Sequence, residues 1–140
     1  MEVKVLIVED NKIFNMILAK KVQQMSAFFK DTDDIEFKIF SASNAEEAAR
    51  IIETEKPKIS ILDYLFDDYS GDRRTGIELL VMLKEQDENS KVIMISRESD
   101  HEVVTEAIEL GAEYFISKEN QLTAIGQLDM AIRGVVNTIK

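Results

Sequence analysis

The chain has 140 residues, of which 45% are hydrophobic, and this size and composition predict a single domain over residues 1–140 with one hydrophobic core. The 27 acidic and 17 basic residues give a formal net charge of −10, which argues against direct contact with a nucleic-acid backbone. The absence of cysteine excludes disulfides and thiolate metal sites.

Membrane and export signals are also missing from the sequence. No apolar run approaches the roughly 20 residues that a membrane-spanning helix needs. The N-terminus leads directly into a strand pattern, without the basic and apolar segments of a signal peptide. We therefore expect a cytoplasmic protein that is not inserted in a membrane.

The first half of the chain alternates between short strand-like runs and longer helical patterns. Residues 3–8 are an apolar run that predicts a strand, and residues 13–30 carry an apolar stripe with helical spacing. Residues 36–40 alternate between apolar and polar side chains, which predicts a second strand. A helical pattern follows, with Ser43 and Asn44 as candidate N-caps.

The second half of the chain repeats this alternation three more times. Strands are predicted over residues 59–62, 92–95 and 114–116, and each is followed by a helical pattern, the last with Asn120 as its candidate N-cap. Five strand–helix units in succession predict an α/β fold, a doubly wound five-stranded parallel sheet with helices on both faces.

Polar side chains follow four of the predicted strands, at the edge where such sheets bind ligands. Glu9 and Asp10 follow the first strand, Asp63 the third, Ser96 the fourth and Lys118 the fifth. The three carboxylates repel one another, and a hard cation such as Mg²⁺ would relieve that repulsion. The set predicts phosphoryl transfer, with Asp63 as the nucleophile and Ser96 and Lys118 contacting phosphoryl oxygens.

These residues resemble the receiver domains of response regulators, and the resemblance covers residues 3–136. It implies a flavodoxin-like sheet with the strand order 2-1-3-4-5. It also implies a role for each matching residue. Glu9 and Asp10 match the metal-binding acidic pair, Asp63 the phosphorylated aspartate, Leu65 the residue whose carbonyl binds the metal, Ser96 and Phe115 the switch pair, and Lys118 the phosphate-binding lysine.

The resemblance further implies Mg²⁺ as cofactor, a histidine kinase or histidine phosphotransfer protein as phosphodonor, and a downstream target protein. Such a domain is not an enzyme in the ordinary sense, because it catalyses only its own phosphorylation and dephosphorylation. Because Tyr114 adjoins Phe115, a plain core aromatic is as good an interpretation of Phe115 as a moving switch.

The sequence departs from the family pattern at several places. Glu119 follows Lys118 where the family usually has proline, and Arg97 follows Ser96 where the family usually has a small residue. The stretch over residues 64–76 is longer than usual, and residues 26–35 predict an extended loop or a lengthened first helix.

Three other functions compete with the receiver. A haloacid-dehalogenase-type phosphatase needs a second aspartate at position 65, which is leucine here. A flavin or nucleotide carrier needs a glycine- or hydroxyl-rich turn after the first strand, where Glu9 and Asp10 stand instead. A receiver-like binding module that works without phosphorylation stays open as the alternative.

Overall fold

The computed structural model describes residues 1–64, 76–97 and 101–140, and in them five parallel strands form one sheet in the order β2-β1-β3-β4-β5. The fold class, the flavodoxin-like topology and the strand order are those predicted from the sequence. The strands are β1 (Glu2–Val8), β2 (Glu36–Ala42), β3 (Ile59–Asp63), β4 (Lys91–Ser96) and β5 (Tyr114–Ser117). The helices are α1 (Lys12–Asp33), α2 (Ala45–Glu55), α3 (Gly76–Gln86), α4 (His101–Glu109) and α5 (Gln121–Ile139).

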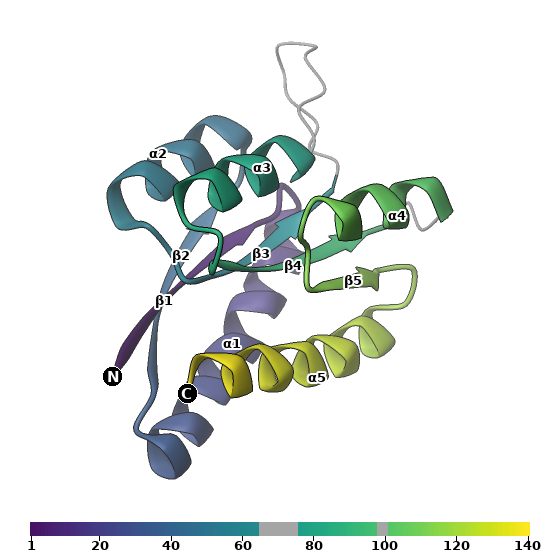
Figure 1. Cartoon of the computed structure of the whole chain (residues 1–140). Helices are drawn as coiled ribbons and strands as arrows, with labels where there is room; N and C mark the ends of the chain where they lie inside the picture. The colour runs from purple at the N-terminus through teal and green to yellow at the C-terminus, as the bar shows by residue number, and fades with distance from the viewer. Residues whose placement is uncertain (65–75, 98–100) are drawn as a thin grey trace.

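The helices cover both faces of the sheet (Figure 1). One face packs against α1 and α5, and its core includes Val22 and Leu128. The other face packs against α2, α3 and α4, and its core includes Ile52 and Leu80. Because both faces are covered, the central strands are apolar on both sides, and all five residues of β3 are buried.

Three helices begin at an asparagine that acts as N-cap. Asn11, Asn44 and Asn120 each have extended backbone angles, and each side chain accepts a hydrogen bond from the N–H three residues later. The caps of the helices after β2 and β5 were predicted, with Asn44 rather than Ser43 serving in α2. The cap at Asn11 directly follows the acidic pair, so it fixes where the chain turns after β1.

The first helix is longer than the sheet it covers. Residues 26–33 continue α1 as helix, and the chain turns at Asp34, whose φ is 55° and whose N–H donates to the carbonyl of Phe29. Of the two expectations for residues 26–35, the lengthened helix is therefore the correct one over most of the segment. Lys21 of α1 pairs with Asp129 of α5 at 2.7 Å, which ties the two helices of this layer together.

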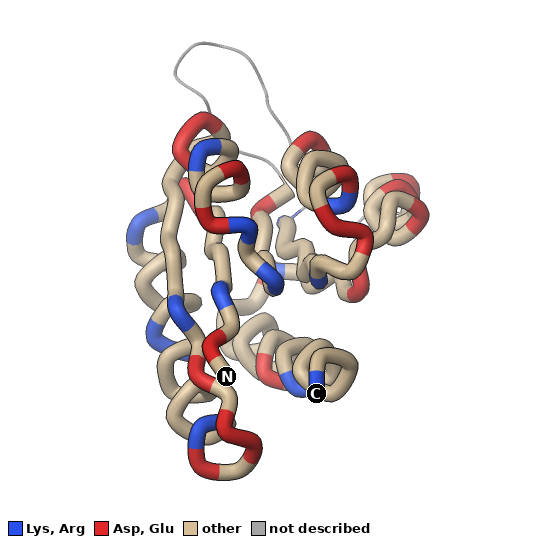
Figure 2. The backbone as a smooth tube through the Cα atoms, turned by 60° about the vertical axis from the view of Figure 1, so that its left-hand side comes forward, with Lys and Arg blue, Asp and Glu red and all other residues tan. Residues whose placement is uncertain are grey.

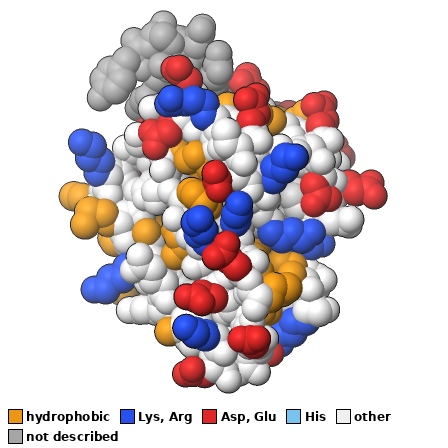
Figure 3. Space-filling view, turned by 90° about the vertical axis from the view of Figure 1, so that its left-hand side faces the viewer, with side chains coloured by type: hydrophobic (Ala, Val, Ile, Leu, Met, Phe, Trp, Pro, Cys, Tyr) orange, Lys and Arg blue, Asp and Glu red, His pale blue; other side chains and the backbone are white. Residues whose placement is uncertain are grey.

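Charged side chains are spread over the molecule. Figure 2 shows acidic residues on most helices and on the turn between α1 and β2. On the side where the N-terminus and α2 lie, Figure 3 shows basic, acidic and hydrophobic side chains interspersed, so this face carries no continuous basic surface. Among the described residues, no helix combines the length and the apolar character that crossing a membrane would require.

Candidate functional site

The candidate site lies at the carboxyl ends of β1, β3, β4 and β5. Glu9 and Asp10 occupy the turn after β1, while Asp63 and Ser96 are the last residues of β3 and β4 rather than the first residues beyond them. Lys118 follows β5, and its N–H donates to the carbonyl of Ser96 at 2.9 Å. The parallel sheet thus brings together five side chains that are more than 100 residues apart at the extremes of the chain.

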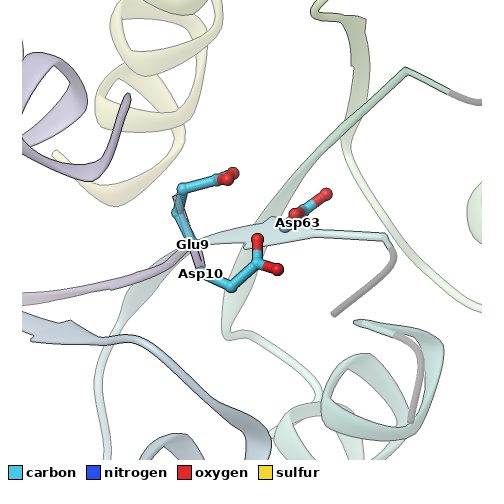
Figure 4. Close-up of side chains that lie close together, drawn as sticks. All are labelled: Glu9, Asp10 and Asp63. Atoms are coloured by element: carbon cyan, nitrogen blue, oxygen red, sulfur yellow. The ribbon is translucent and has the colours of Figure 1, made fainter. Parts of the chain in front are cut away.

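Three carboxylates form the acidic part of the site. One oxygen each from Glu9, Asp10 and Asp63 lie within 4.8 Å of one another. Figure 4 shows the three side chains projecting into the same space from the end of β1 and the end of β3. Glu9 and Asp63 are buried and Asp10 is half-buried, so water screens their mutual repulsion only partly.

Lys118 supplies the positive charge next to these carboxylates. Its Nζ donates to both carboxylate oxygens of Glu9, at 3.1 and 2.9 Å, and to Oδ2 of Asp63 at 3.2 Å. Its side chain is 11% exposed. On a further side, the ammonium lies 5.4 Å from the centre of the Phe14 ring.

The carboxyl pKa values follow from this arrangement. Burial and, next, the charge of Glu9 raise the pKa of Asp63 from 3.8 to about 7, although Lys118 opposes the shift. Burial also raises the pKa of Glu9, against the opposing effect of its ion pair with Lys118. The single ammonium of Lys118 therefore does not fully compensate the free-energy cost of burying two carboxylates and of the repulsion between them.

The backbone at the end of β1 is held by one carboxylate and one amide side chain. Oε1 of Glu9 accepts the N–H of Asn11 at 3.2 Å. Nδ2 of Asn15 donates to the carbonyls of Glu9 at 3.1 Å and Ala42 at 3.3 Å, which joins the ends of β1 and β2. These contacts fix the direction in which the acidic pair leaves the sheet.

Comparison with known proteins decides the family. The family model described as response regulator receiver domain matches residues 5–128, which is most of the chain. The chain belongs to this family. It is a receiver domain of the kind found in two-component response regulators.

Two curated relatives of this receiver are transcriptional regulators from Bacillus subtilis (strain 168). Transcriptional regulatory protein YdfI is 29% identical over 134 residues, covering 95% of this chain and 56% of that protein. Alkaline phosphatase synthesis transcriptional regulatory protein PhoP is 25% identical over 118 residues, covering 84% and 43%. The receiver thus spans about half the length of these relatives.

Solved structures show the same fold. The signal receiver domain of a putative LuxO repressor protein from Vibrio parahaemolyticus superposes with a TM-score of 0.78, at 21% identity over 99% of this chain and 92% of that one. The receiver domain of HemR from Leptospira biflexa, in its non-phosphorylated form, gives a TM-score of 0.76, at 18% identity over 96% and 94%.

The predicted switch residues Ser96 and Phe115 lie on β4 and β5. Ser96 is buried at the end of β4, and Phe115 is half-buried against the core under α2, α3 and α4. Tyr114 points to the opposite face, where its hydroxyl lies against α5 at Gly134. Of the two adjacent aromatics, Phe115 is thus the one on the α4 side. Leu65 lies outside the described residues.

Arg97 and Glu119, the two departures beside the site, lie on the surface of this receiver. Arg97 lines a small cavity of about 40 Å³ together with Glu9, Asn11, Phe14, Lys118 and Gln121. No peptide bond among the described residues is cis, so the bond from Lys118 to Glu119 is trans.

Sequence reasoning missed Gly76, Asn15 and Phe14 as parts of the site. A Cβ on Gly76 would overlap the carbonyl oxygen of Asp63, so only glycine lets α3 start this close to β3. The sequence pattern places Phe14 in a helical stripe and Gly76 at the end of the long stretch over residues 64–76, and it gives neither a role in the site. The position of Asn15 six residues after Glu9 carries no signal, because its role depends on the neighbouring β2.

Proposed function

We propose that this receiver takes a phosphoryl group onto the carboxylate of Asp63 and thereby switches a partner-binding surface. The observation that carries the proposal is the environment of Asp63, a 4% exposed carboxylate between Lys118 and two further carboxylates. Burying this carboxylate beside two like charges costs stability, and such arrangements are typical of functional sites.

The acidic cluster fits Mg²⁺. Glu9, Asp10 and Asp63 offer carboxylate oxygens within 4.8 Å of one another, and hard oxygen ligands are those that Mg²⁺ prefers. The raised pKa values of Glu9 and Asp63 indicate that the buried charges lack sufficient compensation. These three side chains would hold the ion, with the carbonyl of Leu65 as the further ligand that the family implies. When bound, Mg²⁺ would neutralise part of the charge on the phosphoryl oxygens.

The chemical step is an in-line displacement at phosphorus. The deprotonated Asp63 carboxylate attacks a phosphohistidine, one O–P bond forms as the P–N bond breaks, and the leaving imidazole takes up a proton. Lys118 moves from its contact with Asp63 to a phosphoryl oxygen, and the Ser96 hydroxyl donates to another. The donor would be a histidine kinase or a histidine phosphotransfer protein.

Phosphorylation would change the surface through Ser96 and Phe115. The phosphoryl group brings about −1.5 to −2 charges into the site. Drawing Ser96 toward this charge frees space on the α4 side of the sheet, where Phe115 is already half-buried. The surface over α4 and β5 would then present a different shape to a downstream target protein. Catalysis is confined to the receiver's own phosphorylation and dephosphorylation, in the cytoplasm.

Intact-mass spectrometry tests the proposal. The receiver is incubated with acetyl phosphate in Mg²⁺ and, separately, in chelator, beside the variant Asp63→Asn. We expect one phosphoryl adduct in Mg²⁺, none in chelator and none on the variant. If the folded receiver takes no adduct from acetyl phosphate or from a histidine kinase, the phosphorylation-independent binding module replaces this proposal.

A further inference from the structure

One buried aromatic ring adjoins the charged cluster without belonging to it. Phe14 is 4% exposed, and the centre of its ring lies 5.4 Å from Nζ of Lys118. That distance is within the range of about 6 Å over which a ring face attracts a cation. Among the described residues, Nζ also donates to the carboxylate oxygens of Glu9 and Asp63.

We propose that Phe14 is a positioning residue, whose ring holds the Lys118 ammonium between Glu9 and Asp63 and so keeps it ready for the phosphoryl group. The part of the inference that concerns the phosphoryl group rests on the proposed function. The contact itself stands on the geometry of Phe14 and Lys118 alone.

The backbone of Phe14 is fixed by the same turn that fixes the acidic pair. Its N–H donates to Oδ1 of the N-cap Asn11 at 2.9 Å, and the N–H of Asn11 donates to Oε1 of Glu9 at 3.2 Å. These two hydrogen bonds connect Glu9 to the first turn of the helix that carries the ring, and the Lys118 ammonium contacts both side chains.

An aromatic ring suits this position better than either a carboxylate or an alkyl group. A fourth carboxylate would attract the ammonium but would add to the repulsion among Glu9, Asp10 and Asp63. An alkyl side chain would fill the volume without attracting the cation. The ring face attracts the cation and adds no net charge, and the attraction is stronger because the Lys118 side chain is only 11% exposed.

A double-mutant cycle on the unfolding equilibrium tests the contact without any phosphodonor. The four proteins are the wild type, Phe14→Leu, Lys118→Met and the double variant, each unfolded in urea at pH 8 without divalent ions. We expect Phe14→Leu to raise the unfolding equilibrium constant about five-fold more in the wild type than in the Lys118→Met background.

Phe29 provides a matched control, since it is a buried phenylalanine on the same face of α1 and its ring contacts are with Phe28 and Phe37. Phe29→Leu should cost the same in both backgrounds. Equal costs for Phe14→Leu in both backgrounds would overturn the inference and would leave the proposed phosphorylation untouched.

A second variant preserves packing in case Phe14→Leu does not fold. Site-specific 3,4,5-trifluorophenylalanine at position 14 keeps the ring and weakens its negative face. We expect acetyl phosphate to label this protein about three- to ten-fold more slowly than the wild type, with the Mg²⁺ affinity unchanged within about two-fold. Labelling at the wild-type rate would contradict the positioning role, whereas a wild type that takes no label contradicts the proposed function instead.

Discussion

A buried aspartate beside two other carboxylates makes the stability of the fold depend on pH. The pKa of Asp63 is about 7 in the folded protein against 3.8 for the ordinary group. Because folding raises this pKa, the protonated carboxyl favours the folded state at low pH, and that contribution is lost as pH rises from about 4 through about 7. The size of this pKa shift sets an upper limit of about 4 kcal/mol on the loss in free energy of unfolding.

We therefore expect the free energy of unfolding, measured in urea without divalent ions, to fall between about pH 4 and pH 7. Asp63→Asn should flatten this fall, because the amide does not titrate. The comparison between the two proteins matters, since Asp129, whose pKa is lowered by Lys21 and Arg133, contributes in the opposite direction. Identical pH dependence in both proteins would show that Asp63 does not carry the effect.

Removal of the Lys118 side chain should also lower the free energy of unfolding. Lys118→Met leaves Glu9 and Asp63 buried without their cation, and breaking a buried pair in this way costs about 3–5 kcal/mol. Urea unfolding at pH 8 measures this loss. Lys140→Met is the control, because Lys140 and its partner Asp33 lie at the surface, where water and salt screen the pair and its removal costs little. Equal losses for the two variants would contradict the account.

At the scale of elements, the start of α3 determines how close the helix lies to β3, whose last residue is Asp63. A methyl group on Gly76 would overlap the Asp63 carbonyl oxygen, so α3 or the end of β3 has to move. We expect Gly76→Ala to lower the free energy of unfolding by about 1–3 kcal/mol and to slow labelling by acetyl phosphate.

Gly126 in α5 is the matched control for this substitution. A Cβ there meets nothing within 4 Å, so Gly126→Ala should stabilise the receiver by about 0.5–1 kcal/mol and leave labelling unchanged. Thermal unfolding and labelling kinetics of the two variants provide the comparison. If Gly76→Ala also stabilises the receiver and leaves labelling unchanged, neither stability nor labelling requires the close approach of α3 to Asp63.

The elements themselves were readable from the sequence, because apolar periodicity and asparagine caps are local signals. The strands extend one or two residues beyond the predicted bounds, which is why Asp63 and Ser96 belong to β3 and β4. The contacts of Asn15 with Ala42 and of Phe14 with Lys118 were not readable, because each joins segments far apart in the chain.

At the scale of the whole molecule, the order of the strands brings their carboxyl ends together. The alternation of strand and helix patterns in the sequence was enough to predict that the acidic residues lie at these ends. The roles of all the predicted site residues, in metal binding, phosphorylation and switching, stay predictions, and so does the single-domain expectation. What the sequence could not supply was the degree of burial, which raises the pKa of Asp63 from 3.8 to about 7.

Mg²⁺ binding should stabilise the whole fold, because it relieves repulsion that exists only when the strand ends are assembled. At a free concentration about 100 times the dissociation constant, linkage predicts a gain of about 2.7 kcal/mol. A thermal melt in millimolar Mg²⁺ at pH 8 should therefore move to a higher temperature, and Asp10→Asn should reduce the shift. A melt that Mg²⁺ does not move would argue against a metal at this site.

The most direct test of the central claim is to locate the phosphoryl group. An acyl phosphate on aspartate is reduced by borohydride to homoserine, so the receiver is phosphorylated in Mg²⁺, reduced, digested and sequenced by mass spectrometry. The account predicts homoserine at position 63, dependent on both the phosphodonor and Mg²⁺, with Asp10 unchanged. Homoserine at another aspartate, or at none in a folded and Mg²⁺-loaded receiver, would contradict it.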